Sequence, residues 1–186
     1  MTLNKSQRSN LLLFGLLVIL FFTPLGGIIK ERVTRLLSFS PSVENIEDRV
    51  VVNNFDWKLK GLNTKNYDFN ESKGKVVLVN FWATWCPSCR AEKPSIQKLY
   101  IDYSGKVDFI FITNEDSQTI KKYLDKYNYN LPIYNQMSNG PSEFNVSSIP
   151  ATYLLNKKGE IIVHKVGAAD WNSEKFRKLL DELIVE

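Results

Sequence analysis

The sequence contains few of the residues that cross-link a fold or hold a metal. Its 186 residues include two cysteines, Cys86 and Cys89, and one histidine, His164. A structural zinc site needs four ligands, typically a second cysteine pair or two histidines, so the composition argues against one. A disulfide between residues three apart closes a very small loop, and disulfide stabilisation grows with loop length. Redox chemistry is therefore the favoured interpretation of the pair, and His164 is interpreted as a structural or surface residue.

A dense basic block is also missing. The net charge is +4, and the lysines and arginines are dispersed along the chain, which is typical of a solvated surface. This distribution argues against a nucleic-acid-binding protein. No segment repeats along the chain, so a repeat architecture is excluded.

One long hydrophobic run is present, at residues 11–29, after a short N-terminal tail of residues 1–10. The run has nineteen residues without a charge, and as a helix it would span about 28 Å, close to the thickness of a bilayer core. The alternative is a cleavable signal peptide, but no convincing small-residue cleavage site comes after the run. We expect an uncleaved transmembrane anchor. Basic residues on both sides leave its orientation open, and its position near the N-terminus favours export of the downstream residues.

Residues 30–50 have the polar composition of a tether, and residues 51–186 have that of a globular domain. Alternating or continuous apolar runs predict strands, and apolar residues at helical spacing predict helices. We expect strands at residues 57–62, 67–69, 76–82, 107–113, 131–134, 151–155 and 160–166, and helices at residues 86–103, 117–127 and 174–184. Strands that alternate with helices imply a parallel centre, and the closing hairpin adds antiparallel strands. The predicted fold class is α/β, a mixed sheet with helices on both faces.

The local sequence around the cysteines suits thiol chemistry. Cys86 follows a predicted buried strand and opens a helix, where free N–H groups and the helix dipole stabilise a thiolate. The thiolate is the nucleophile, so Cys86 is the expected attacking residue. Cys89 lies one turn later, where it can attack a mixed disulfide and release the partner. Pro87 fits the first turn because its missing N–H has no partner there.

Two segments carry a resemblance to a known fold. Residues 79–89, Val-Asn-Phe-Trp-Ala-Thr-Trp-Cys-Pro-Ser-Cys, resemble the active-site segment of the thioredoxin fold, and residues 148–153, Ser-Ile-Pro-Ala-Thr-Tyr, resemble its cis-proline segment. With Glu92 and Pro94, the first segment is similar to that of the membrane-anchored TlpA-like group, which includes reductases of cytochrome c maturation. The resemblance covers about residues 51–186 and implies a thioredoxin-like domain.

The resemblance implies roles for individual residues. Pro150 is expected to be cis and to lie beside Cys86, where the backbone of Ile149 pairs with an incoming peptide. A trans turn is the alternative for Pro150. Trp85 is expected at the rim of the active site, and with Pro87 it completes the predicted substrate-binding set.

Glu92 is the third predicted catalytic residue, beside Cys86 and Cys89. Thioredoxins carry a buried aspartate six residues before the first cysteine, and Asn80, which does not titrate, stands there in this chain. Glu92 lies three residues after Cys89, on the same side of a helix. We interpret it as the proton acceptor for Cys89, and the alternative is a solvated surface glutamate.

The predicted function is a membrane-tethered thiol–disulfide oxidoreductase outside the cytoplasm that reduces disulfides of exported proteins. Its expected partners are protein thiols and disulfides and a membrane electron donor, with no cofactor, while the direction of electron flow stays open. One alternative is copper delivery by Cys86, Cys89 and His164, although copper-delivery proteins of this fold usually space the cysteines one residue wider. Another is a thiol peroxidase, which would need a Thr/Pro-rich loop around its cysteine.

Overall fold

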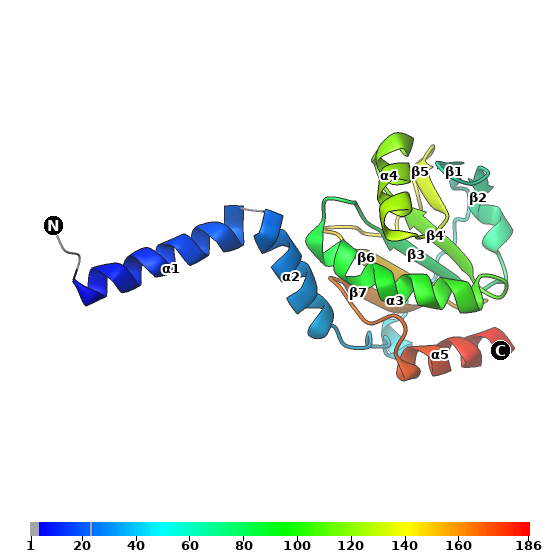
Figure 1. Cartoon of the computed structure of the whole chain (residues 1–186). Coiled ribbons are helices and arrows are strands. Elements are labelled where there is room, and N and C mark those ends of the chain that lie inside the picture. The colour runs from blue at the N-terminus through cyan, green and yellow to red at the C-terminus, as the bar shows by residue number, and fades with distance from the viewer. Residues whose placement is uncertain (1–3, 23) are drawn as a thin grey trace.

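The computed structural model describes residues 4–22 and 24–186, and begins with two helices. These are α1 (Lys5–Phe22) and α2 (Pro24–Leu36), and α1 extends away from the rest of the molecule (Figure 1). The predicted span at residues 11–29 is divided between them, and its Thr23 lies outside the described residues, as do residues 1–3 of the predicted tail. In the described part of the chain, no helix is both long enough and apolar enough to cross a membrane.

Seven strands form one mixed sheet in the order β2-β1-β5-β4-β3-β6-β7. The three inner strands β3, β4 and β5 are parallel, and the other pairings are antiparallel. The strands are β1 (Lys58–Gly61), β2 (Tyr67–Asp68), β3 (Val77–Phe81), β4 (Asp108–Ile112), β5 (Ile133–Gln136), β6 (Ala151–Leu155) and β7 (Ile161–Val166). The predicted mixed sheet with a parallel centre and a closing hairpin is confirmed.

Three helices come after strands of this sheet and begin at capping side chains. They are α3 (Pro87–Tyr103), α4 (Ser117–Tyr127) and α5 (Glu174–Val185). Asp116 and Ser173 accept hydrogen bonds from the first turns of α4 and α5, which satisfies donors that have no partner inside the helix. Two 3₁₀ turns complete the elements, η1 (Ile46–Asp48) and η2 (Phe69–Ser72).

The two faces of the sheet are covered differently. One face, here called the helical face, packs Leu78 of β3 with Ile96, Ile120 and Leu180 from α3, α4 and α5. The other, the loop face, packs side chains from η2 and from irregular segments of the chain against the strands. Its buried residues outside the strands include Val52, Trp57, Phe69 and Phe144.

The prediction of helices on both faces is therefore wrong for α3, α4 and α5. The cause is topological. The β3–α3–β4 and β4–α4–β5 crossovers step in the same direction across the sheet. Because such crossovers are right-handed, both helices lie on the same face.

Residues 30–50, the predicted tether, contact the rest of the molecule. On α2, Glu31 accepts a hydrogen bond from the Arg90 guanidinium at 3.1 Å, and Arg35 donates to the carbonyl oxygen of Ala91 at 3.3 Å. Farther along, the N–H of Glu44 donates to the carbonyl oxygen of Ile162 on β7 at 2.9 Å. These contacts place α2 beside the start of α3, close to the cysteine pair.

The pairing of β3 with β6 determines where the active-site segments meet. The strands are antiparallel, with Phe81 opposite Ala151 and Asn80 opposite Thr152. The end of β3 therefore lies beside the start of β6. The loop that leads to Cys86 and the segment that ends at Pro150 consequently lie at the same end of the sheet.

Candidate active site

Cys86 and Cys89 form a disulfide at the N-terminus of α3, with their Cα atoms 5.2 Å apart. Cys86 is the N-cap residue of the helix, and its Sγ accepts a hydrogen bond from the N–H of Cys89 at 3.2 Å. Cys86 is 5% exposed, whereas Cys89 is fully buried. The sulfur that solvent reaches is thus the one that the helix terminus would stabilise as a thiolate.

The Ile149–Pro150 peptide bond is cis, as predicted. The carbonyl oxygen of Ile149 lies 3.7 Å from the Sγ of Cys86, so the segment lies beside the cysteine as expected. The carbonyl oxygen of Pro150 accepts a hydrogen bond from the N–H of Gly167 at 2.8 Å, which ties the segment to the end of β7.

Glu92 is buried, with 1% of its surface exposed, which excludes the solvated-surface alternative. Its Oε1 accepts from the Asn80 amide at 2.9 Å. Its Oε2 accepts from the indole N–H of Trp171 at 2.8 Å and from the N–H of Ala169 at 3.4 Å. Burial raises the pKa of Glu92, while the nearby charge of Lys93 and the donated hydrogen bonds oppose that rise. The carboxyl group is therefore held one turn from Cys89, inside the protein.

Lys93 is a second buried charged residue that the sequence interpretation missed. It is fully buried, and its Nζ donates to the Oδ1 of Asn80 at 2.7 Å. The ammonium group lies 4.1 Å from the ring centre of Trp82 and 4.9 Å from that of Phe111. Burial lowers the pKa of Lys93 to about 7, and the charge of Glu92 opposes that decrease.

A sequence signal for the burial of Lys93 did exist. Cys89, Lys93 and Ile96 have the spacing of one helical face, and the flanking two are buried. Helical spacing could not identify the hydrogen-bond partners of Glu92 and Lys93. Asn80 lies before α3 in the chain, and Trp171 lies far after it.

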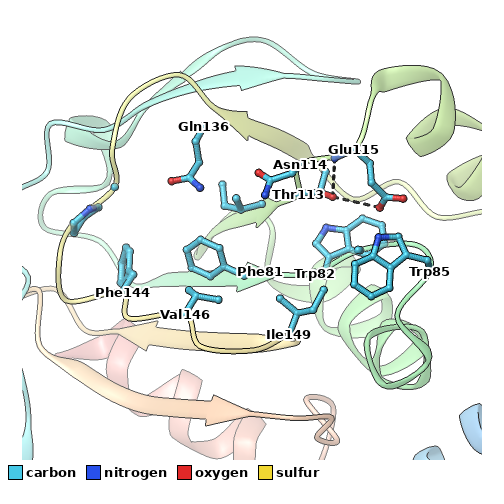
Figure 2. Close-up of a pocket in the computed structure, with 14 residues that line it drawn as sticks. Phe81, Trp82, Trp85, Thr113, Asn114, Glu115, Gln136, Phe144, Val146 and Ile149 are labelled. Carbon is cyan, nitrogen blue, oxygen red and sulfur yellow. Dashed lines mark hydrogen bonds between the residues drawn. The ribbon is translucent and has the colours of Figure 1, made fainter.

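A groove of about 530 Å³ lies on the loop face of the sheet, and its lining includes Trp85, which precedes Cys86, and Ile149. Figure 2 shows Phe81, Phe144 and Val146 along one part of it, and Trp85 and Ile149 at another. The carbonyl oxygen of this Ile149 is the one that lies 3.7 Å from the Sγ of Cys86. Trp85 is 68% exposed and forms part of the rim, as predicted.

The rim of this groove also contains a carboxylate that the sequence interpretation missed. The side chain of Glu115 accepts from the N–H of Thr84 at 2.6 Å and from its hydroxyl at 2.5 Å. The hydroxyl of Thr113 donates to the same carboxylate at 3.3 Å (Figure 2). Glu115 thus fixes the loop that leads from β3 to Cys86.

His164 lies apart from the cysteines. Its exposed ring on β7 stacks on Tyr153, with ring centres 4.4 Å apart, on the loop face. Among residues 4–22 and 24–186, no three His, Cys, Asp or Glu side chains gather closely enough to hold a metal ion. No contact in the described structure supports the copper-delivery alternative.

Comparison with known proteins identifies the family. The model of the AhpC/TSA family matches residues 52–164 of the chain. The chain belongs to this family. Thioredoxin-like protein YneN of Bacillus subtilis is 37% identical over 130 residues, which are 68% of this chain and 75% of YneN. The thiol-disulfide oxidoreductase ResA of Halalkalibacterium halodurans is 33% identical over 126 residues, 66% of this chain and 72% of ResA.

A solved structure is similar to this chain in fold. StoA of Bacillus subtilis superposes with a TM-score of 0.53 at 25% identity, covering 69% of this chain and 95% of StoA. Together with the disulfide at the start of α3, the relatives identify the activity of the protein as that of a thiol–disulfide oxidoreductase. The thioredoxin-like resemblance found in the sequence is confirmed.

The hydrogen bond from the Trp171 indole to Glu92 gives a stability prediction, for which Trp57 supplies a matched control. Trp171 and Trp57 are both fully buried, but the indole N–H of Trp57 has no hydrogen-bond partner among the described residues. Trp171→Phe should lower the free energy of unfolding by about 1–3 kcal/mol more than Trp57→Phe, because it leaves a buried acceptor with one donor fewer.

The pH dependence of that difference tests its origin. The lost bond favoured the charged form of Glu92, so Trp171→Phe should raise the pKa of Glu92 further. The excess destabilisation should therefore be absent below pH 4.5, the ordinary pKa of a glutamate, and should appear as the pH rises through the folded-state value. Urea unfolding over a pH series measures it, and an equal loss for both variants at every pH would contradict the prediction.

Proposed function

We propose that this thiol–disulfide oxidoreductase reduces disulfides of exported proteins, using the Cys86–Cys89 pair in a dithiol–disulfide cycle. The observation that carries the proposal is the position of the Cys86 sulfur. It lies at a helix N-terminus, within 3.7 Å of the Ile149 carbonyl oxygen and at the end of a groove.

The cycle begins with the protein in its dithiol form. The Cys86 thiolate attacks one sulfur of the substrate disulfide, so that a mixed disulfide forms and the first substrate thiol leaves. Cys89 then loses its proton and attacks the Sγ of Cys86, which releases the second substrate thiol and forms the Cys86–Cys89 disulfide. Two electrons and two protons pass to the substrate, and a dithiol partner in the membrane returns them to the protein.

Glu92 accepts the proton of Cys89 in this cycle. Residues three apart in a helix are neighbours on its surface, with Cβ atoms about 5–6 Å apart. Cys89 is fully buried, so water does not reach its thiol directly. A buried carboxylate one turn away is the nearest base on the same helix, and burial raises its pKa, which makes it a stronger base.

The groove supplies the binding site for the substrate polypeptide. Trp85 and Pro87 flank Cys86 in the chain, and the segment of Ile149 and Pro150 lies beside it, so that the carbonyl oxygen of Ile149 is an acceptor for a substrate N–H. The aromatic and aliphatic walls formed by Phe81, Phe144 and Val146 would pack against apolar side chains beside the substrate disulfide. Components of cytochrome c maturation are one substrate class that the sequence resemblance suggests.

The proposal includes a membrane anchor at residues 11–29. Its support is the uncharged sequence and the outward apolar side chains of α1, since Leu12 is 75% exposed and Phe14 is 68% exposed. Exposed apolar surface of this kind is costly in water and favourable in lipid. A single-pass anchor would hold the thiol site outside the cytoplasm, beside the membrane, where the electron donor lies.

Trapping experiments test the division of labour between the cysteines. Cys89→Ala should accumulate a covalent partner through Cys86, because no second thiol can release it. Cys86→Ala should trap far less, since Cys89 is buried. The measurement is non-reducing electrophoresis of the full chain from cells, followed by identification of the trapped proteins. Equal trapping by both variants would overturn the assignment, and a set limited to cytochrome c maturation components would specify the substrate class.

Glu92→Gln tests the proton acceptor. The second step, in which Cys89 releases the bound thiol, should slow by about 10²-fold and should lose its dependence on a group that titrates above pH 4.5. Oxidised glutathione serves as the substrate, and release of the second thiol is measured at a series of pH values. Glu182→Gln, at an exposed position on α5, is the control and should match the wild-type protein. An unaltered profile for Glu92→Gln would remove Glu92 from the mechanism.

A reporter fused after Glu186 tests the location. A reporter that is active only outside the cytoplasm should be active on the full chain, and deletion of residues 11–29 should abolish that activity. Activity of a cytoplasm-only reporter at the same position would refute the proposed orientation.

A further inference from the structure

The buried Lys93 has no part in the cycle described above, although a fully buried lysine is costly to keep in a protein core. A buried ammonium group needs hydrogen-bond acceptors or negative charge to offset its loss of hydration. Lys93 has one acceptor among the described residues, the Oδ1 of Asn80, and the faces of two aromatic rings, Trp82 and Phe111. Aromatic faces stabilise the charged form of lysine. This environment accommodates a cation beside the active site.

Asn80 connects this cation to Glu92. Its carbonyl end accepts from Lys93 at 2.7 Å, and its amide end donates to Glu92 at 2.9 Å and to the Thr152 hydroxyl at 2.7 Å. The Asn80 dipole thus points its negative end at the ammonium and its positive end at the carboxylate. Consecutive residues of a helix point in different directions, so Glu92 and Lys93 meet through a side chain of β3.

Among neighbouring charges, Glu92 and Lys93 are each influenced mainly by the charge of the other. Within the described part of the chain, Lys93 is the charge that acts on the pKa of Glu92, and Glu92 is the charge that acts on that of Lys93. The groups that contact the pair from β3, β4 and β6 are the uncharged Asn80, Phe111 and Thr152. The loop after β7 contributes Trp171 and Ala169 to Glu92, and its Asp170 carboxylate instead accepts from the N–H of Asn172 at 3.1 Å. On the same face of α3, the cysteine pair lies about one turn before Glu92 and Lys93, and Tyr103 lies at the far end of the helix, where its hydroxyl donates to Asp181 at 2.9 Å.

We propose that Lys93 is a positioning residue that, acting through Asn80, keeps Glu92 in its carboxylate form so that Glu92 can take the proton of Cys89. This inference rests on the proposed role of Glu92. Lys93 does not touch the sulfurs in this role. Its positive charge, delivered to the carboxylate by the oriented amide, opposes the effect of burial on Glu92.

The test removes the positive charge of Lys93 and keeps a side chain of similar length. In Lys93→Met, the acidic limb of the pH profile for thiol release by Cys89 should move to higher pH by about one unit or more, the size expected for loss of a close opposite charge. Lys93→Gln, which can still donate to Asn80, should shift the limb in the same direction. The control is Lys98→Met, at an exposed position of the same helix, which should leave the limb in place.

A direct titration of the carboxyl group supplies a readout besides activity. Isotope-edited infrared or NMR spectra of the full-length Cys86→Ala/Cys89→Ala protein, with Glu92→Gln for assignment, should show Glu92 protonating at higher pH when Lys93 is replaced. A purely structural role of Lys93 would change unfolding without changing this titration, and that result would overturn the inference.

The double variant Glu92→Gln/Lys93→Met separates this inference from the proposed function. If Lys93 acts through Glu92, adding Lys93→Met to Glu92→Gln should not move the pH profile further. A further movement of the same size would show that Lys93 acts by another route and would overturn the inference. An unaltered limb in both Lys93 variants, beside a changed profile for Glu92→Gln, would also overturn it while leaving the proposed function intact. An unaltered profile for Glu92→Gln alone would refute the role of Glu92 on which the inference rests, and with it the inference.

Discussion

The antiparallel pairing of β3 with β6 is the constraint on which the site depends. Phe81, the last residue of β3, lies opposite Ala151, the first residue of β6. The loop from β3 to Cys86 and the segment that ends at Pro150 therefore meet at the same end of the sheet. One step back along the same ladder, Asn80 stands opposite Thr152 and donates to its hydroxyl. A shift of one residue would turn Asn80 to the loop face, because side chains alternate across a strand. The pairing of β3 with β6 therefore positions both the Pro150 segment beside Cys86 and the Asn80 amide that links Glu92 to Lys93.

The buried charged groups of Glu92 and Lys93 explain why the core around them contains several side-chain hydrogen bonds. Removing one member of a buried ion pair typically costs about 3–5 kcal/mol, because the other charge is left without compensation. Here the charged groups meet donors or acceptors from β3 and from the loop after β7. Such a network contributes less to net stability than apolar residues would. Its position beside a buried thiol suits the proposed proton transfer, because a carboxylate and a cation in a region of low dielectric act strongly on each other.

The division of the sheet into a helical face and a loop face separates two tasks. The helical face buries Cys89, Glu92 and Lys93 under α3 and keeps bulk water from these side chains. The loop face lacks α-helices in the described domain, and irregular segments leave the groove that ends at Trp85 and Ile149. Cys86 lies where the two meet, because it comes after β3 and begins α3. In the proposed cycle, a substrate in the groove would meet the Cys86 sulfur on the loop side, and Glu92 would take the proton of Cys89 on the helical side.

The sequence by itself determined the elements, the cysteine pair and the family resemblance, because these depend on local patterns. Apolar periodicity defined β3 and α3 almost to the residue, and the spacing of Cys86 and Cys89 on a helix start indicated their chemistry. Only the tertiary structure decided that Glu92 is buried and that Lys93 is linked to it, because their partners come from strands and loops far away in the chain. The placement of α3 and α4 on one face was likewise decided by crossover direction, and α5 packs against the same face. Periodicity shows that a strand is buried on both sides, and it does not show what covers each side.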